Sequence, residues 1–274
     1  MPRVKVACAQ LNPTRGDVAG NMRRVDAMTS RLTADDGVDV LLLPEMALTG
    51  YVFDDARDAR RVAERDDGPT TRWCRALAAR LRCVVACGYP RAVPRERGEE
   101  EEGGGEGGGG GGDRDDSRTS SDDDVDVEVD DDDVLYNALV VVAADGTVLT
   151  RYHKTHLYVV DETWASEGSG FVSVPIPVRD GAGGESGENG PGSGESVVVA
   201  TLGICMDINP RGFVAPWSAH ELARACLKHE SSLLLFASAW TNNHPDDPPE
   251  SVTPVDPNEV ARSLPGSHTT ALAW

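Results

Sequence analysis

The first ninety residues alternate between short apolar runs and longer amphipathic segments. The apolar runs predict strands at 4–11, 38–44 and 83–89. Two intervening segments place apolar residues at helical spacing: Met22, Val25, Met28 and Leu32 in the first, and Trp73, Leu77 and Leu81 in the second, which follows Thr70. This β-α-β-α-β order predicts an α/β sheet covered by helices.

The pattern resumes after residue 133. LYNALVVV (135–142) and TVLTRYHKTHLY (147–158) flank the tight turn ADG and predict a β-hairpin. Further strands are expected at SVVVAT, before Cys205, and at 232–240, with a helix between them near 217–229. That helix is expected to turn Leu222, Cys226 and Leu227 inward. Beyond Trp240 the chain is rich in Pro and acidic residues, and a loop is expected there.

Charge is spread very unevenly along the chain. The formal net charge is −20, and residues 94–133 alone hold 18 acidic and 4 basic side chains. Such a segment cannot bury enough apolar surface to offset its ordering entropy, so a disordered acidic and Gly-rich insertion is expected at 94–133. A second, Gly-rich loop is expected at 180–196. The remaining chain is only mildly acidic, which argues against a nucleic-acid-binding surface.

The cysteine pattern bears on the cellular compartment. The six cysteines form no CxxC pair, and most lie in apolar runs, as is typical of a reducing compartment. The N-terminus reads as a strand without a long apolar stretch, so neither a signal peptide nor a membrane span is expected. A cytoplasmic location, or also a nuclear one, follows as an expectation, with no membrane partner.

Three chemically able residues stand where predicted strands end: Glu45, Lys154 and Cys205. Sites in open α/β sheets gather at strand ends. Each residue alone has an ordinary reading, as a turn charge, a strand-end charge or a core thiol. Together they supply a base, a cation for an oxyanion and a nucleophile, which is a complete set for acyl transfer.

Histidine chemistry is the weaker alternative. His153 and His156 would point to opposite faces of a continued strand, which argues against a Cys–His pair and against a metal site. The same alternation places Lys154 and His156 on one face.

Four stretches, VACAQLNPTRGDVAGNMRRV, LLLPEMALTGY, YNALVVVAADGTVLTRYHKTHLY and GICMDINP, resemble the nitrilase (carbon–nitrogen hydrolase) superfamily. They occur in that family's order. The resemblance implies an α/β fold of the α-β-β-α sandwich type, forming one domain over 1–274. Because members of that superfamily continue with a further strand and helix, the C-terminal part of the fold is expected to be incomplete here. It also implies a Glu45–Lys154–Cys205 triad without any cofactor or metal. A second catalytic Glu is expected after the lysine motif, with Glu162 the better match and Glu167 the second.

Within the superfamily, GICMDINP, DETWASEG and the SAW after the last strand look most like the protein N-terminal amidase branch. That resemblance implies protein or peptide N-termini bearing Asn or Gln as substrates, deamidated to Asp or Glu with release of ammonia. The products would then feed the N-degron pathway.

Four further residues are candidates for the substrate pocket. The carboxylate of Asp207 is a candidate partner for the substrate α-ammonium, although capping its own turn is an equally good reading. The backbone N–H of Met206 is a candidate oxyanion donor. Tyr51 and Trp164 are candidate pocket walls, although core packing is the more common role of such rings.

Two other functions remain open. One is a nitrilase-family amidase for small-molecule amides or carbamoyl compounds, which would not depend on a free α-amine. The other is a non-catalytic, truncated scaffold or binding protein, whose Cys205 would alkylate no faster than the other thiols. The sequence does not distinguish Asn from Gln as substrate, and it does not give the oligomeric state.

Overall fold

The computed structural model describes residues 3–95, 129–179, 195–214 and 216–239. Its larger sheet has the strand order β1-β2-β3-β4-β5, with β1, β2 and β3 parallel and β4 and β5 antiparallel to their neighbours. The strands are Val6–Cys8 (β1), Val40–Leu42 (β2), Val84–Val93 (β3), Val134–Val142 (β4) and Val148–His153 (β5).

A second sheet has the order β6-β7-β8, with β6 antiparallel and β8 parallel to the central β7. Its strands are Ser173–Arg179 (β6), Glu195–Ile204 (β7) and Leu233–Ala237 (β8). The α-helices are Val18–Met28 (α1), Ala56–Arg60 (α2), Pro69–Leu81 (α3) and Glu221–Lys228 (α4). Short 3₁₀ turns are Ala34–Asp36 (η1), Asp161–Thr163 (η2), Cys205–Ile208 (η3), Arg211–Phe213 (η4) and Trp217–Ala219 (η5).

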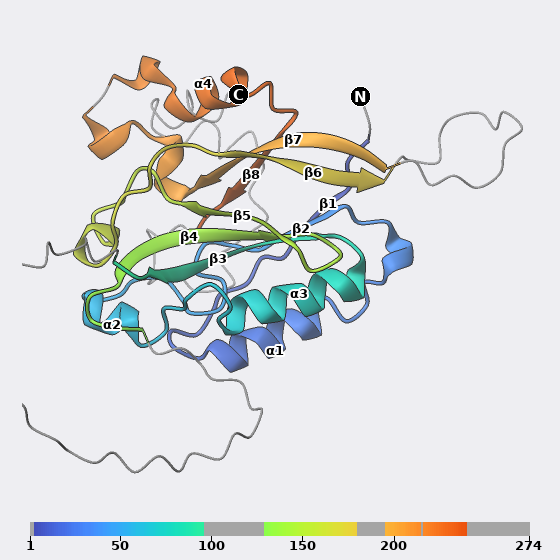
Figure 1. Cartoon of the computed structure of the whole chain (residues 1–274), viewed down its shortest axis with the longest axis horizontal. Coiled ribbons are helices and arrows are strands. Elements are labelled where there is room, and N and C mark those ends of the chain that lie inside the picture. Colours follow the sequence, from blue (N-terminus) through green and yellow to red (C-terminus); the bar gives the residue numbers. More distant parts are fainter. Residues whose placement is uncertain (1–2, 96–128, 180–194, 215, 240–274) are drawn as a thin grey trace, which may run out of the picture.

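The layers stack in the order helix, sheet, sheet, helix. Figure 1 shows α1 and α3 below the larger sheet and α4 above β7. Along β3, Val85 and Cys87 face the helices, whereas Val84 and Ala86 face the second sheet. The strand is buried on both faces, which is why its sequence is a continuous apolar run. The expected α-β-β-α sandwich is confirmed.

Local sequence explains where the two long helices begin. Asp17 caps α1 by accepting the Gly20 N–H at 2.9 Å, and Pro69 occupies the first position of α3, where its missing N–H costs nothing. Val25 of α1 is fully buried, as expected. Met28, the last residue of α1, is 48% exposed.

The helix after Cys205 is shorter than predicted. α4 spans 221–228, and the preceding residues form η5 instead. Leu222 is buried, but Leu227 is 72% exposed, so the expectation that Leu227 points inward was wrong. Leu222 and Leu227 are five residues apart, which at 3.6 residues per turn places them on different faces.

Both predicted insertions fall mostly outside the described residues. Of 94–133, residues 96–128 lie outside. Residues 130–132 are exposed, whereas Asp133 is buried and pairs with Arg65 at 2.9 Å. Of 180–196, residues 180–194 lie outside, and Glu195 and Ser196 begin β7. Everything after Ala239 also lies outside.

No helix in the described part of the chain is long and apolar enough to cross a membrane.

Candidate active site

Glu45 is held at the end of β2 by a tight backbone contact. Pro44 and Glu45 come two and three residues after β2, and β3 passes so close that a Cβ at Gly88 would lie 2.6 Å from both the Glu45 Cα and the Pro44 carbonyl oxygen. Only glycine tolerates such an approach. The Glu45 side chain is fully buried, with the Ala239 N–H donating to Oε2 at 2.9 Å. The fold therefore fixes this carboxylate from both sheets.

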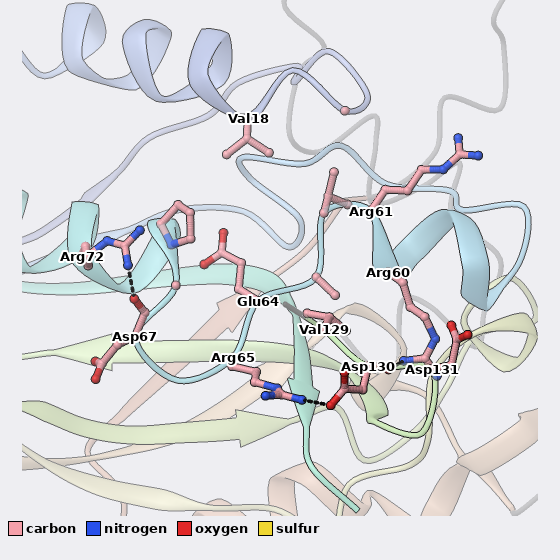
Figure 2. A pocket seen from close by; sticks show the side chains of 15 residues that line it. Val18, Arg60, Arg61, Glu64, Arg65, Asp67, Arg72, Val129, Asp130 and Asp131 are labelled. Carbon is pink, nitrogen blue, oxygen red and sulfur yellow. Dashed lines mark hydrogen bonds and ion pairs between the residues drawn. The ribbon is translucent and has the colours of Figure 1, made fainter. Parts of the chain in front are cut away.

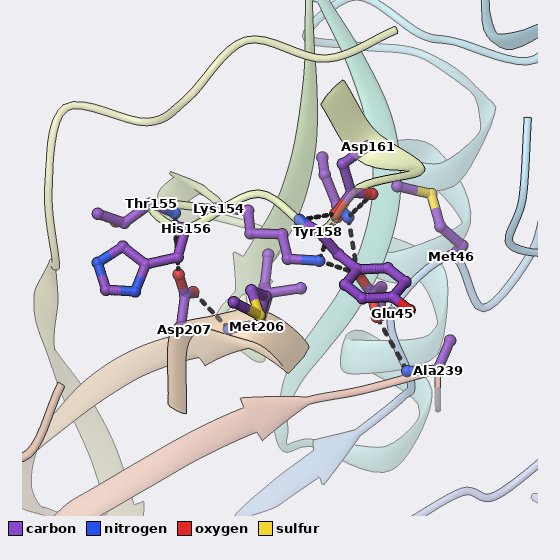
Figure 3. A network of polar contacts seen from close by, with 12 residues as sticks. Glu45, Met46, Lys154, Thr155, His156, Tyr158, Asp161, Met206, Asp207 and Ala239 are labelled. Carbon is purple, nitrogen blue, oxygen red and sulfur yellow. Dashed lines mark hydrogen bonds and ion pairs between the residues drawn. The ribbon is translucent and has the colours of Figure 1, made fainter. Parts of the chain in front are cut away.

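Lys154 follows β5 and points at two carboxylates. Its Nζ lies 2.8 Å from Glu45 Oε1 and 2.6 Å from Asp161 Oδ2, and all three side chains are fully buried (Figure 3). Burial by itself lowers the pKa of Lys154, but the two carboxylates outweigh burial and the net pKa is raised. Lys154 is therefore a permanent cation at this site.

Asn137 completes this cluster from the middle of β4. Its Nδ2 donates to Glu45 Oε1 at 2.7 Å and to Asp161 Oδ1 at 3.1 Å, and its backbone carbonyl accepts the Lys154 N–H at 2.8 Å. Asn137 was not among the predicted site residues. The available signal was a polar residue inside the apolar run LYNALVVV, because a polar side chain in a buried strand requires a partner.

The second carboxylate at Lys154 belongs to Asp161, and the expectation for Glu162 is corrected. Glu162 is exposed on the same 3₁₀ turn, η2. Successive side chains of a 3₁₀ turn point about 120° apart, so turning Asp161 inward turns Glu162 outward. Glu167 forms an ion pair with Arg211 at the surface and does not contact Lys154.

Cys205 stands at the sharp turn between β7 and η3, with a backbone φ of 41°. A positive φ is costly for any residue with a side chain, and such strain is concentrated at functional sites. The pKa of the partly buried thiol is raised to about 12, first by burial and then by the Glu45 carboxylate, while the Lys154 ammonium acts in the opposite direction. The structure therefore brings Glu45, Lys154 and Cys205 together, with the thiol protonated at rest.

This protonation changes one expectation. Rapid alkylation of Cys205 relative to the other thiols requires a thiolate in the ligand-free protein, and the raised pKa argues against it. Turnover, rather than resting reactivity, is the measurement that separates an enzyme from an inactive scaffold.

Asp207 does not have a free carboxylate for a substrate ammonium. The side chain is 1% exposed, and both oxygens already accept hydrogen bonds from Tyr152, Thr155, His156 and Ile204. Burial raises the pKa of Asp207 to about 6, although these donors act in the opposite direction. The expectation that Asp207 contacts substrate is corrected, because its hydrogen-bonding capacity is used within the chain.

The two aromatic residues that were candidates for pocket walls lie in different places. The Tyr51 ring centroid lies 5.8 Å from Lys154 Nζ, and burial together with Glu45 and Asp161 raises the pKa of its hydroxyl, so it stays a neutral phenol beside the site. Trp164 instead packs edge-on against Phe53 at 5.1 Å between ring centroids, within a hydrophobic cluster. The expectation for Trp164 is corrected: it is a core residue.

Only the backbone N–H of Met206 remains a candidate for the site. Its side chain is 2% exposed, and its sulfur accepts a hydrogen bond from Asn209 Nδ2 at 3.5 Å. The proposed use of its N–H, directly after the thiol, does not depend on that side chain.

The two histidines lie in different surroundings. His153 stacks on Tyr136 at 3.8 Å between ring centroids, and His156 Nδ1 lies 2.9 Å from the Asn209 carbonyl oxygen. β5 ends at His153, so strand alternation does not govern His156. Among the described residues, no group of three or more His, Cys, Asp or Glu side chains could hold a metal ion.

A cavity of about 830 Å³ lies elsewhere, beside α2 and the N-terminus of α3 (Figure 2). Several of its charged residues are paired within the chain: Arg65 binds Asp130 at 2.8 Å, and Arg72 donates to the Asp67 carbonyl at 2.7 Å. None of Glu45, Lys154 and Cys205 lines this cavity. Its internally balanced charges do not indicate a second reaction centre.

Comparison with known proteins identifies relatives of this chain. The chain is 27% identical over 246 residues to the protein N-terminal amidase of Saccharomyces cerevisiae, covering 88% of this chain and 45% of the relative. It is 26% identical over 230 residues to the protein N-terminal amidase of Schizosaccharomyces pombe, covering 82% of this chain and 62% of the relative.

Solved structures of N-terminal amidase share the fold. One superposes with a TM-score of 0.66 at 26% identity, covering 90% of this chain and 50% of that chain. Another, in complex with an Asn-Glu-Ala peptide, superposes with a TM-score of 0.67 at 25% identity, covering 91% of this chain and 51% of that chain. The chain thus spans about half the length of the relatives it resembles.

The carbon-nitrogen hydrolase family pattern matches residues 5–244, a range that contains Glu45, Lys154, Asp161 and Cys205. The chain belongs to the carbon-nitrogen hydrolase family.

Proposed function

We propose that this chain carries the reaction centre of an amidase that deamidates N-terminal Asn or Gln. The observation that carries the proposal is the buried Glu45–Lys154–Asp161 cluster facing the Cys205 thiol. Similarity to two yeast protein N-terminal amidases over most of the chain supports the substrate class. The unpaired cysteines are consistent with a cytoplasmic enzyme, whose products would enter the N-degron pathway.

Acylation follows from the positions of these groups. With Lys154 between two carboxylates, the cluster has a net negative charge, so Glu45 can take the thiol proton as Cys205 attacks the side-chain amide carbon. The resulting oxyanion is stabilised by the Lys154 ammonium and the Met206 N–H. Glu45 then returns the proton to the departing nitrogen, the C–N bond breaks, and ammonia leaves behind a thioester.

Deacylation uses the same groups. Glu45 takes a proton from water, and the resulting hydroxide attacks the thioester carbon. The C–S bond breaks, the proton returns to the Cys205 sulfur, and the substrate leaves as the carboxylic acid. Every proton is moved by residues of this chain, so the proposed reaction requires no cofactor.

The substrate class is tested with short peptides beginning in Asn or Gln, in free-amine and N-acetylated forms. We expect ammonia release from the free-amine peptides only, because an N-terminal amidase must pair the α-ammonium with a polar group when it buries it. Equal release from acetylated peptides, or release only from free small amides, would favour the small-molecule amidase alternative.

The role of Asp161 is tested with its neighbour as a matched control. Asp161→Asn removes one of the two charges that hold Lys154, so we expect kcat to fall by roughly tenfold or more. Glu162→Gln makes the same chemical change one position along on an exposed side chain, and turnover should be retained. Steady-state ammonia release from a Gln peptide is the measurement. A larger loss in the Glu162 variant would contradict this assignment.

A further inference from the structure

Asp207 has an unusually complete set of hydrogen bonds for a residue that does not contact the reacting groups. Oδ1 accepts the backbone N–H groups of Thr155 at 3.1 Å and His156 at 2.8 Å. Oδ2 accepts the Tyr152 hydroxyl and the Ile204 N–H, both at 2.7 Å. We call Asp207 and these four donors the Asp207 clamp.

The four donors come from two segments of the chain. Tyr152, Thr155 and His156 surround Lys154 in the sequence, and Ile204 immediately precedes Cys205. Figure 3 shows Asp207 beneath Thr155 and His156, on the side of Lys154 away from Glu45. The clamp therefore joins the backbone that carries the cation to the backbone that carries the thiol.

The clamp is also rigid. Asp207 is buried, and hydrogen bonds to a charged acceptor are about twice as strong as those between neutral groups. The side chain of Lys154 binds its two carboxylates on one side of the 152–156 segment. Asp207 binds the backbone of the same segment on the other side. The strained backbone of Cys205 needs such support, because a positive φ persists only where the surroundings determine it.

We propose that Asp207 is a positioning residue, which sets the placement of Lys154 relative to Cys205 by binding both backbone segments. It does not touch substrate. This inference rests on the proposed function, since the placement matters to the extent that Lys154 and Cys205 act on one oxyanion. A displacement of about 1 Å between reacting groups lowers a rate by roughly a hundredfold.

Asp207→Asn tests the proposal, because its amide keeps one acceptor oxygen and presents N–H groups to the remaining donors. We expect kcat for a Gln peptide to fall by roughly 10- to 100-fold with KM within roughly threefold.

The control is Asp39→Asn. Asp39 is also buried and also accepts two backbone N–H groups, from Lys5 at 2.8 Å and Arg179 at 2.9 Å, but it lies before β2, at the opposite end from Glu45. Asp39→Asn should lower stability and leave kcat unchanged.

A second variant keeps the proposal testable if Asp207→Asn does not fold. Tyr152→Phe removes one of the four bonds and keeps the carboxylate, so it should lower kcat less than Asp207→Asn does while the protein remains folded by circular dichroism. A kcat equal to that of the unmodified protein in both variants, or in Tyr152→Phe alone if Asp207→Asn does not fold, would overturn the proposal.

Alkylation of Cys205 by iodoacetamide gives a readout independent of turnover. Loss of the negative charge of Asp207 would, by electrostatics alone, favour the thiolate and speed alkylation. Displacement of Lys154 would do the opposite. We expect slower alkylation of Cys205 relative to the exposed Cys8 in the same sample, measured by peptide mass spectrometry. Unchanged or faster alkylation would overturn the positioning role. If the unmodified protein releases no ammonia, the proposed function fails, and the alkylation result still decides the role of Asp207.

Discussion

Replacing Cys205 with alanine is expected to reduce ammonia release from Asn and Gln peptides to background, a loss of roughly 10³-fold or more. The nucleophile is the one group whose chemistry the neighbours cannot replace. Glu45 and Lys154 would remain in place, because their contacts with Asp161, Asn137 and Ala239 do not involve the thiol. The variant should therefore fold and bind substrate while failing to form the thioester.

The control for this loss is Cys226→Ala. Cys226 is also a partly buried thiol and lies on α4, away from Glu45 and Lys154. We expect it to retain activity. Rapid-quench mass spectrometry should detect an acyl adduct on a tryptic peptide containing Cys205 in the unmodified protein and none in Cys205→Ala. Substantial turnover by Cys205→Ala would contradict the proposed nucleophile.

Replacing Lys154 with methionine is expected to lower both stability and activity. Methionine has a similar length, but it leaves the Glu45 and Asp161 carboxylates buried without a cation. Breaking a buried ion pair in this way costs about 3–5 kcal/mol of unfolding free energy, because the remaining charge is uncompensated. Urea denaturation followed by circular dichroism measures the loss. We also expect Lys154→Met to abolish turnover, because it removes the ammonium that stabilises the oxyanion.

A double variant separates the two effects. Lys154→Met combined with Asp161→Asn removes one of the uncompensated charges, so it should be more stable than Lys154→Met and equally inactive. Arg15→Met is the control for a charge loss at the surface, since the Arg15–Asp54 pair is 45% and 76% exposed, and a much smaller stability loss is expected. A Lys154→Met protein as stable as the unmodified chain would contradict the buried-charge argument.

Several features of the fold could be predicted because they depend on local pattern. The apolar runs at 38–44 and 83–89 predicted strands, which the structure shows as β2 and β3, and the spacing of Trp73, Leu77 and Leu81 predicted the helix that the structure shows as α3. Glu45, Lys154 and Cys205 could be predicted as site residues for the same reason. Each follows a strand that the local pattern predicts, and each has a side chain that can act as a base, a cation or a nucleophile.

The local sequence pattern did not predict which way a side chain points where that direction depends on tertiary packing. Asp161 and Glu162 are adjacent carboxylates with nothing in the sequence to rank them, and only the docking of η2 onto Lys154 turned Asp161 inward. Leu227 was misplaced because it lies five residues after Leu222, which turns it away from the face of α4 that Leu222 buries. In both cases one residue of shift along a turn or helix changes which side chain faces the core.

The sequence by itself determined the α/β class, the strand-end positions of three reactive groups and the family to which they point. The tertiary structure decided their partners: Asn137 and Asp161 on one side of Lys154, and Asp207 on the other. The reason is physical. A strand or helix follows from neighbours within a few residues, whereas the hydrogen bonds of a buried charge come from segments tens of residues away, and only the folded chain brings these together.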